Sequence, residues 1–193
     1  MCGIAGLIHR GKSSNVGEEL QSMLQALKHR GPDSTGYALY ANNDGQNFIL
    51  RFKVGENVGE GSSSVNEDES VYNERKKTVD KKLSELGAPI VKEEKLTPYS
   101  YRYEIKFDKD LMDFSKAIES IESVEILSIG KSLELIKDLG DANAVSERYG
   151  LKKVQGTHGI GHARMATESG VDIKSAHPFW GYPFADVSVV HNG

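Results

Sequence analysis

The chain begins with an apolar run typical of a strand, and an amphipathic stretch follows it. Residues 3–9 carry enough apolar side chains for a short buried strand. From 16 to 28 such side chains recur every three or four positions, which predicts a helix with one buried face. Asn15 and Glu18 have the spacing of an N-cap and its capping box. We therefore expect the helix to begin there and to end before Gly31, which a proline follows.

Two more strands are predicted beyond this helix, at 35–41 and 48–53. The residues 42–45 between them are two asparagines, an aspartate and a glycine, which favour a tight turn. We therefore expect the two strands to pair as a hairpin. Strand patterns return near the end of the chain, at 156–166 and 186–191.

The middle of the chain, 55–155, has a different composition. Residues 55–70 are rich in glycine, serine and acidic residues, which is typical of a flexible surface loop. The remainder, 71–155, alternates helical and strand patterns, so we predict a small α/β unit inserted into the main sheet. Its helices are expected at 71–87 and 111–122, with one or two more over 133–149, and its strands at 101–107 and 124–129.

Composition and charge narrow the class of protein. The 193 residues are 38% hydrophobic and 27% charged, with a formal net charge of −4. No segment forms a basic stripe, which argues against nucleic acid as a partner. No apolar run reaches the length of a membrane span or of a signal-peptide core, and a single cysteine excludes an internal disulfide framework. We expect one globular domain, carrying a large insertion, in the cytoplasm and not at a membrane.

The single cysteine, Cys2, directly follows Met1. Removal of Met1 would make this thiol N-terminal, and its own α-amine, with a reference pKa of about 8, could then serve as its base. An isolated cysteine is more often a small buried hydrophobe. The second position, with glycines at Gly3 and Gly6, favours the interpretation as a nucleophile.

Two polar groups near the end of the chain are further candidates. Arg164 could bind a carboxylate with two parallel hydrogen bonds, and Thr167 could add a third donor. Asn192 and Gly193 could donate a side-chain and a backbone N–H to a tetrahedral oxyanion. Each group also fits a plain structural role, an ion pair for the arginine and a tight turn for the Asn-Gly pair. His191 lies beside that pair.

Two other motifs are considered and set aside. Residues 6–13 fit the phosphate-binding pattern G-x-x-x-x-G-K-S, but too few residues precede Gly6 to supply the strand that such a loop needs. His158 and His162 are four positions apart, which would suit a shared metal ion on a helix. The glycines between them favour a strand, on which the two residues stand about 13 Å apart. We therefore expect no metal site.

Five segments, in this order, resemble the class II glutamine amidotransferases of the N-terminal nucleophile hydrolase superfamily. They are CGIAG at 2–6, HRGPDSTG at 29–36, GHARMAT at 161–167, AHP at 176–178 and VHNG at 190–193. The resemblance covers about 1–54 and 156–193. With its long middle segment, the chain is most similar to the amidotransferase domain or subunit of archaeal-type glutamate synthases.

The resemblance implies a fold, a reaction and site residues. The fold would be α+β, a four-layer αββα sandwich over 1–193, with 55–155 inserted. The reaction would be hydrolysis of L-glutamine to L-glutamate and ammonia through a thioester on the N-terminal cysteine. The implied roles are nucleophile for Cys2, oxyanion donors for Asn192 and Gly193, and substrate binding for Arg164, Thr167 and His191, with Arg30 bracing the nucleophile's loop.

The resemblance also implies a partner. A synthase subunit or domain would accept the ammonia and carry any flavin or iron–sulfur centre, so no cofactor is expected in this chain. The aspartate that binds the glutamine α-amine in the family is expected beyond Gly193, and the chain is therefore expected to be incomplete at its C-terminal end. Two alternatives stay open: an inactive relative that binds glutamine or a partner, and a nucleotide-binding protein that uses residues 6–13.

Overall fold

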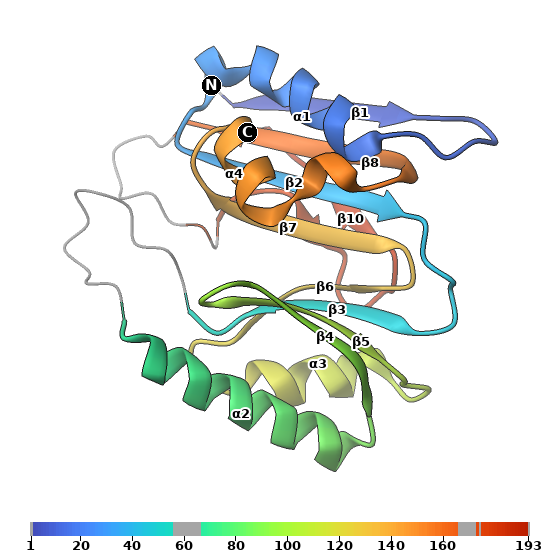
Figure 1. Cartoon of the computed structure of the whole chain (residues 1–193), viewed down its shortest axis with the longest axis vertical. Helices are drawn as coiled ribbons and strands as arrows, with labels where there is room; N and C mark the ends of the chain where they lie inside the picture. Colours follow the sequence, from blue (N-terminus) through green and yellow to red (C-terminus); the bar gives the residue numbers. More distant parts are fainter. Residues whose placement is uncertain (1, 56–66, 166–172, 174, 193) are drawn as a thin grey trace.

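Two antiparallel β-sheets lie stacked between two pairs of helices (Figure 1). The computed structural model describes residues 2–55, 67–165, 173 and 175–192. Helices α1 and α4 cover the outer face of one sheet, and α2 and α3 cover the outer face of the other (Figure 1). The helices are α1 (Val16–Ala26), α2 (Glu69–Leu86), α3 (Leu111–Glu119) and α4 (Ala142–Tyr149).

Two of the predicted site residues, Cys2 and Arg164, lie next to or on strands of the first sheet. Its strand order is β1-β8-β2-β7. Leu20 and Leu24 of α1 are fully buried against this sheet, together with Tyr37 of its β2 strand. Burying each such side chain stabilises the fold by about 1.5–3 kcal/mol. The strands are β1 (Gly3–Ile8), β2 (Ser34–Ala41), β7 (Leu133–Leu139) and β8 (Gly156–Arg164).

The second sheet has the order β4-β5-β3-β6 and packs its outer face on α2 and α3. That core is rich in aromatic residues, among them Phe52, Tyr101 and Tyr103. A short pair, β9 (Phe179–Trp180) and β10 (Ser188–Val189), stands apart, with Trp180 packed against both the second-sheet core and the cluster between the sheets. The strands of the second sheet are β3 (Phe48–Lys53), β4 (Ile90–Thr97), β5 (Ser100–Ile105) and β6 (Glu125–Gly130).

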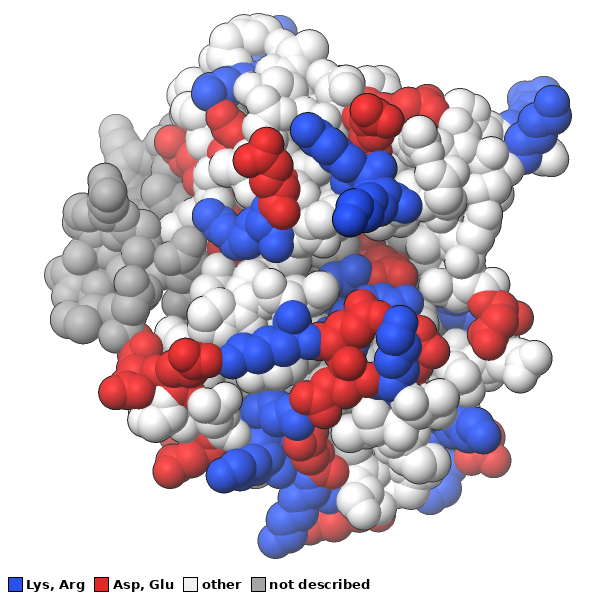
Figure 2. Space-filling model, viewed as in Figure 1, with Lys and Arg blue, Asp and Glu red and all other residues white. Residues whose placement is uncertain are grey.

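The layer between the sheets is part apolar and part charged. Leu127, Leu133 and Leu135 form an apolar cluster there. Beside it, the buried Arg51 and Arg102 of the second sheet both bind Glu134 of β7. On the face shown in Figure 2, acidic and basic side chains are interspersed without a broad patch of either sign. Among the described residues, no helix is long and apolar enough to cross a membrane.

The predicted hairpin between 35–41 and 48–53 is wrong, although both strands exist. β2 pairs with β7 and β8 in the first sheet, whereas β3 pairs with β5 and β6 in the second. The turn-forming residues after β2 therefore carry the chain from one sheet to the other. A turn signal predicts a change of direction but does not identify the strand that will become the partner.

The helix predicted over 133–149 is also wrong in its first half. Residues 133–139 form β7, and only 142–149 are helical. Both faces of β7 are buried, with Leu135 packed between the sheets and Ile136 packed toward α1 and α4. A strand buried on both faces loses the alternation that distinguishes it from a helix.

The middle segment is not a separate unit. Strands β4, β5 and β6 pair with one another or with β3 in the second sheet, while β7 and α4 belong to the first sheet and its helical layer. Residues 71–155 thus supply elements to both halves of the molecule. The residues 56–66, most of the predicted flexible loop, lie outside the described part of the chain.

Most other predicted elements are confirmed within a few residues, and so is the α+β class. The capping box of α1 is not: Asn15 makes no side-chain cap, and its amide contacts Glu18 at 3.4 Å instead. Two stacked sheets between helices are compatible with the predicted four-layer sandwich. Its N-terminal nucleophile type stays a prediction.

Candidate functional site

The pairing of β1 with β8 places Cys2 beside Arg164. Gly3 is the register partner of Ala163, so the residue before Gly3 lies next to the residue after Ala163 at the same end of the sheet. Cys2 and Arg164 are both half-buried. Ala163 packs toward the helices, and because side chains alternate along a strand, Arg164 projects from the opposite face.

Asn192 completes this corner from the other end of the sequence. Its side-chain Nδ2 donates a hydrogen bond to the carbonyl oxygen of Cys2 at 3.3 Å. Its neighbour His191 is exposed, as Asn192 itself is. The structure therefore brings together three of the predicted site residues, Cys2, Arg164 and Asn192. Gly193 and Thr167 lie outside the described residues.

The segment from His29 to Gly36 supports this end of β8. The backbone N–H of Asp33 donates to the carbonyl of Arg164 at 3.2 Å. A side chain at Gly31 would place its Cβ 2.6 Å from the carbonyl oxygen of Ala163, so this close approach requires glycine. Arg30 itself is exposed, in a short 3₁₀ turn that ends at that residue. Its predicted role, like that of His191, stays a prediction.

Two further histidines surround the corner. His162 of β8 is 2% exposed, and neither ring nitrogen has a hydrogen-bond partner in the described structure. Burial, with the nearby charges of His177 and Arg164, lowers the pKa of His162 to about 4. Burial also lowers the pKa of His177, and the charge of His191 acts in the same direction. Both rings are therefore neutral at neutral pH.

The sequence reasoning gave His162 and His177 no functional role in this site, although both lie in segments that carry the resemblance. Their ring centroids are 5.1 Å apart, and the ring of His177 is 6.4 Å from that of His191. The signal available beforehand was the AHP segment at 176–178, which carried no stated chemistry. Only the fold shows that it lies against the strands of the site.

The two motifs set aside from the sequence occupy strands. Gly6 to Ile8 belong to β1 and pair with β8, so they form no phosphate-binding loop. His158 and His162 both lie on β8, as predicted, and His158 stacks on Tyr40 with centroids 3.9 Å apart. The residues that the structure describes contain no cluster of three or more metal-ligating side chains.

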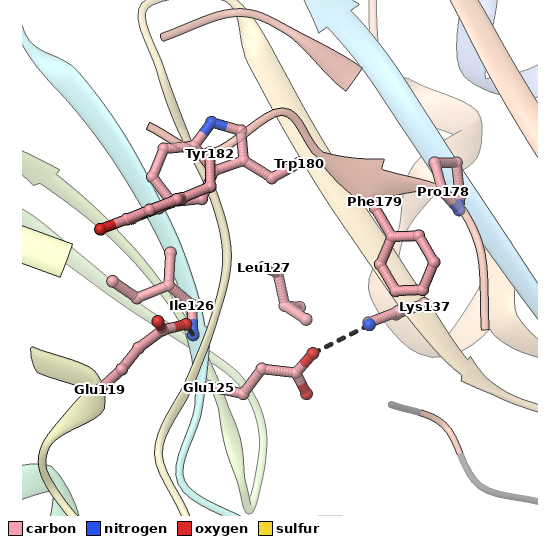
Figure 3. A pocket seen from close by; sticks show the side chains of 9 residues that line it. All are labelled: Glu119, Glu125, Ile126, Leu127, Lys137, Pro178, Phe179, Trp180 and Tyr182. Atoms are coloured by element: carbon pink, nitrogen blue, oxygen red, sulfur yellow. Dashed lines mark hydrogen bonds and ion pairs between the residues drawn. The ribbon is translucent and has the colours of Figure 1, made fainter. Parts of the chain in front are cut away.

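A cavity of about 200 Å³ is lined in part by Pro178 and Phe179, the two residues that follow His177 (Figure 3). Phe179, Trp180 and Tyr182 line one side of it. Lys137, which is 2% exposed, pairs with Glu125 at 2.8 Å and lies 5.0 Å from the ring centroid of Phe179. The Lys137–Glu125 ion pair therefore lies against Phe179, two residues after His177.

Comparison with known proteins supports the resemblance predicted from the sequence motifs. Residues 1–48 match a family model described as a glutamine amidotransferase domain. Over its whole length the chain is 36% identical to a protein of Methanothermobacter thermautotrophicus named as a candidate glutamine amidotransferase, of which it covers 61%. It is 31% identical, also over its whole length, to the glutamine amidotransferase-like protein GlxB of Rhizobium meliloti, of which it covers 58%.

A shorter match points to a second named activity. Over 72 residues, 37% of the chain and 12% of the relative, the chain is 35% identical to glutamine–fructose-6-phosphate aminotransferase of Pyrobaculum aerophilum. The chain spans about three fifths of the length of the two relatives that match it throughout. These matches agree with the resemblance that the five segments predict: the chain is similar to glutamine amidotransferases.

Proposed function

We propose that this chain is a glutaminase domain that hydrolyses L-glutamine to L-glutamate and ammonia. One observation carries the proposal: the amide of Asn192 contacts Cys2 while strand pairing sets Arg164 beside it. The proposed nucleophile, oxyanion donor and carboxylate-binding cation therefore lie close together, which supports the proposal. The names of the relatives indicate which amide the substrate would be, namely glutamine.

In the proposed reaction the α-amine of Cys2, free after removal of Met1, takes the thiol proton. The sulfur then bonds to the side-chain carbonyl carbon of glutamine. As the C–N bond breaks, the ammonium formed on the α-amine donates that proton to the leaving nitrogen, so that ammonia departs and a thioester remains. Water, deprotonated by the same amine, attacks the thioester, which releases glutamate and restores the thiol.

The oxyanion of each tetrahedral intermediate needs a donor. Asn192 Nδ2 already donates a hydrogen bond to the carbonyl oxygen of Cys2. The backbone N–H of Gly193 is the proposed second donor. Removing one such donor typically lowers kcat by about 10²–10³.

Arg164 is proposed to bind the glutamine α-carboxylate, assisted by Thr167. Its position at a strand end is well suited to this, because the sheet holds the start of the side chain while its guanidinium projects from the face. Arg30 is proposed to brace the nucleophile's loop, and His191 belongs to the same proposed substrate-binding set. The ammonia would pass to a synthase partner or domain of the glutamate synthase type.

Mass analysis, ammonia release, labelling and thermal stability test the proposal. Intact-mass analysis should show loss of Met1, and purified protein should release ammonia from glutamine but not from asparagine. Cys2→Ala should abolish release, and a glutamine-analogue electrophile should add its mass to the N-terminal peptide alone. A methionine-blocked, correctly folded and inert protein would instead support the inactive relative. ATP should leave the melting temperature unchanged, and an increase would favour the nucleotide-binding alternative.

A further inference from the structure

His177 packs against two histidines of the candidate site segments but takes no part in the proposed chemistry. Its ring stands between two others, with centroids 5.1 Å from His162 and 6.4 Å from His191. His162 is fixed by the strand pairing of β8, whereas His191 immediately precedes Asn192. The ring of His177 therefore links a rigid strand to the segment that carries the proposed oxyanion donor.

The backbone of His177 is seated directly on the first sheet. Gly36 of β2 faces it, and a Cβ at that position would overlap the carbonyl oxygen of His177 and lie 2.7 Å from Cδ of Pro178. Gly36 is also the register partner of His162 on β8 and of Lys137 on β7. The absence of a side chain at this central position allows the approach.

The far side of His177 is also packed. Phe179 meets its ring edge to face at 4.5 Å, and Lys137 lies under Phe179 as part of its pair with Glu125 (Figure 3). The charged or titratable groups that act on the pKa of His177 are His191, Lys137 from β7 and Arg164 from β8, and the ring of His162 packs against that residue. Because the ring of His177 is neutral at neutral pH, it packs near Lys137 and Arg164 without like-charge repulsion.

Few described contacts hold the His191-Asn192 segment that His177 would position. His191 and Asn192 are exposed, and the contacts described for them are the ring approach to His177 and the 3.3 Å bond from Asn192 to Cys2. A single hydrogen bond of that length at an exposed amide does not fix a side chain well. Packing against a seated ring restricts the backbone from which the amide projects.

We infer that His177 is a positioning residue, which holds the His191-Asn192 segment against Cys2, and that Gly36 provides its seat. The inference rests on the proposed function, because it concerns the placement of the proposed oxyanion donor. It predicts that His177 acts through Asn192 and that ring packing, not proton transfer, is the property that matters.

The test compares His177→Ala and His177→Phe with His158→Ala. This matched control removes a different stacked histidine, one that lies on β8. We expect His177→Ala to lower kcat for glutamine about 10- to 100-fold with KM within twofold, and His177→Phe to stay within about fivefold of the wild type. The double variant His177→Ala with Asn192→Ala should lose no more than Asn192→Ala alone, because residues that act as a unit are not additive.

A second readout does not depend on activity. Amide hydrogen exchange measured by mass spectrometry should rise in the peptide containing 187–192 in His177→Ala but not in His177→Phe or His158→Ala. If the wild-type protein does not hydrolyse glutamine but exchange is still faster in His177→Ala, the positioning role is supported and the proposed function is refuted. Unchanged exchange, losses that multiply in the double variant, or a Phe variant as impaired as the Ala variant would each overturn the inference.

Discussion

Replacing Glu134 with glutamine tests whether the charged contacts between the sheets stabilise the fold. Glu134 accepts hydrogen bonds from Nε of Arg51 and Nε of Arg102, each at 2.9 Å. The side chains of Glu134, Arg51 and Arg102 are 7%, 5% and 10% exposed. Glutamine keeps the shape of the side chain but removes the negative charge that Arg51 and Arg102 share, while Arg102 keeps its ion pairs with Glu94 and Glu104. Breaking such a buried group typically costs about 3–5 kcal/mol of unfolding free energy.

The pKa of Glu134 gives a second route to this magnitude. Burial alone would raise the pKa, but Arg51 and Arg102 outweigh it and lower the pKa from 4.5 to about 2. At about 1.4 kcal/mol per pKa unit, this shift corresponds to about 3 kcal/mol. Because the folded-state pKa is depressed, the stabilisation is complete above pH 4.5 and is lost as the pH falls toward 2.

Urea unfolding followed by circular dichroism at pH 7 measures the effect. We expect Glu134→Gln to lower the unfolding free energy by about 3 kcal/mol, and the exposed control Glu74→Gln to change it by less than about 0.5 kcal/mol. The difference between wild type and Glu134→Gln should shrink between pH 4.5 and 2. A loss below 1 kcal/mol at pH 7, or a difference independent of pH, would refute the reasoning.

Four other predictions concern the site and the core. Arg164→Lys should raise KM for glutamine at least about tenfold, because a point charge replaces a bidentate donor, while the alkylation rate of Cys2 stays unchanged. Wild-type stability should rise between about pH 4 and 6.5 relative to His162→Asn, because the unfolded histidine binds a proton that the buried one does not; parallel pH curves in urea unfolding would contradict this. Gly31→Ala should lower thermal stability by about 1–3 kcal/mol, measured by calorimetry against Gly6→Ala, whose added Cβ meets Ile160 at 3.4 Å. Leu24→Ala should cost about 2–5 kcal/mol in urea unfolding, since Leu24 is fully buried; a loss under 1 kcal/mol would show that α1 is not held by this contact.

Local pattern predicted the elements whose apolar residues recur at helical spacing or form a short run bounded by turn residues. Helix α1 was predictable because its apolar side chains lie on one side, and β1 and β3 because short apolar runs end in turn residues. β4 was not predicted, because most of its side chains, including Lys92 and Glu94, are polar and solvent-facing at a sheet edge. Strand partners depend on long-range packing, which no local pattern contains.

The site was predictable to the extent that its chemistry is carried by residue type. Cys2, Arg164 and Asn192 stand out by chemistry, and the fold brings them together. Gly36 and His177 do not stand out, because their importance lies in how closely a loop approaches a strand. Such distances are a product of the tertiary structure and leave no periodicity in the sequence.

The hydrogen bond between Asn192 and Cys2 spans 190 positions of the chain. During synthesis, the thiol emerges before the amide, which follows only after the residues between them have been translated. A partly made chain therefore carries the nucleophile without the group that would stabilise its reaction. In the proposed enzyme, glutamine would be spared until the polypeptide had closed on itself, so completion of folding itself would switch the activity on.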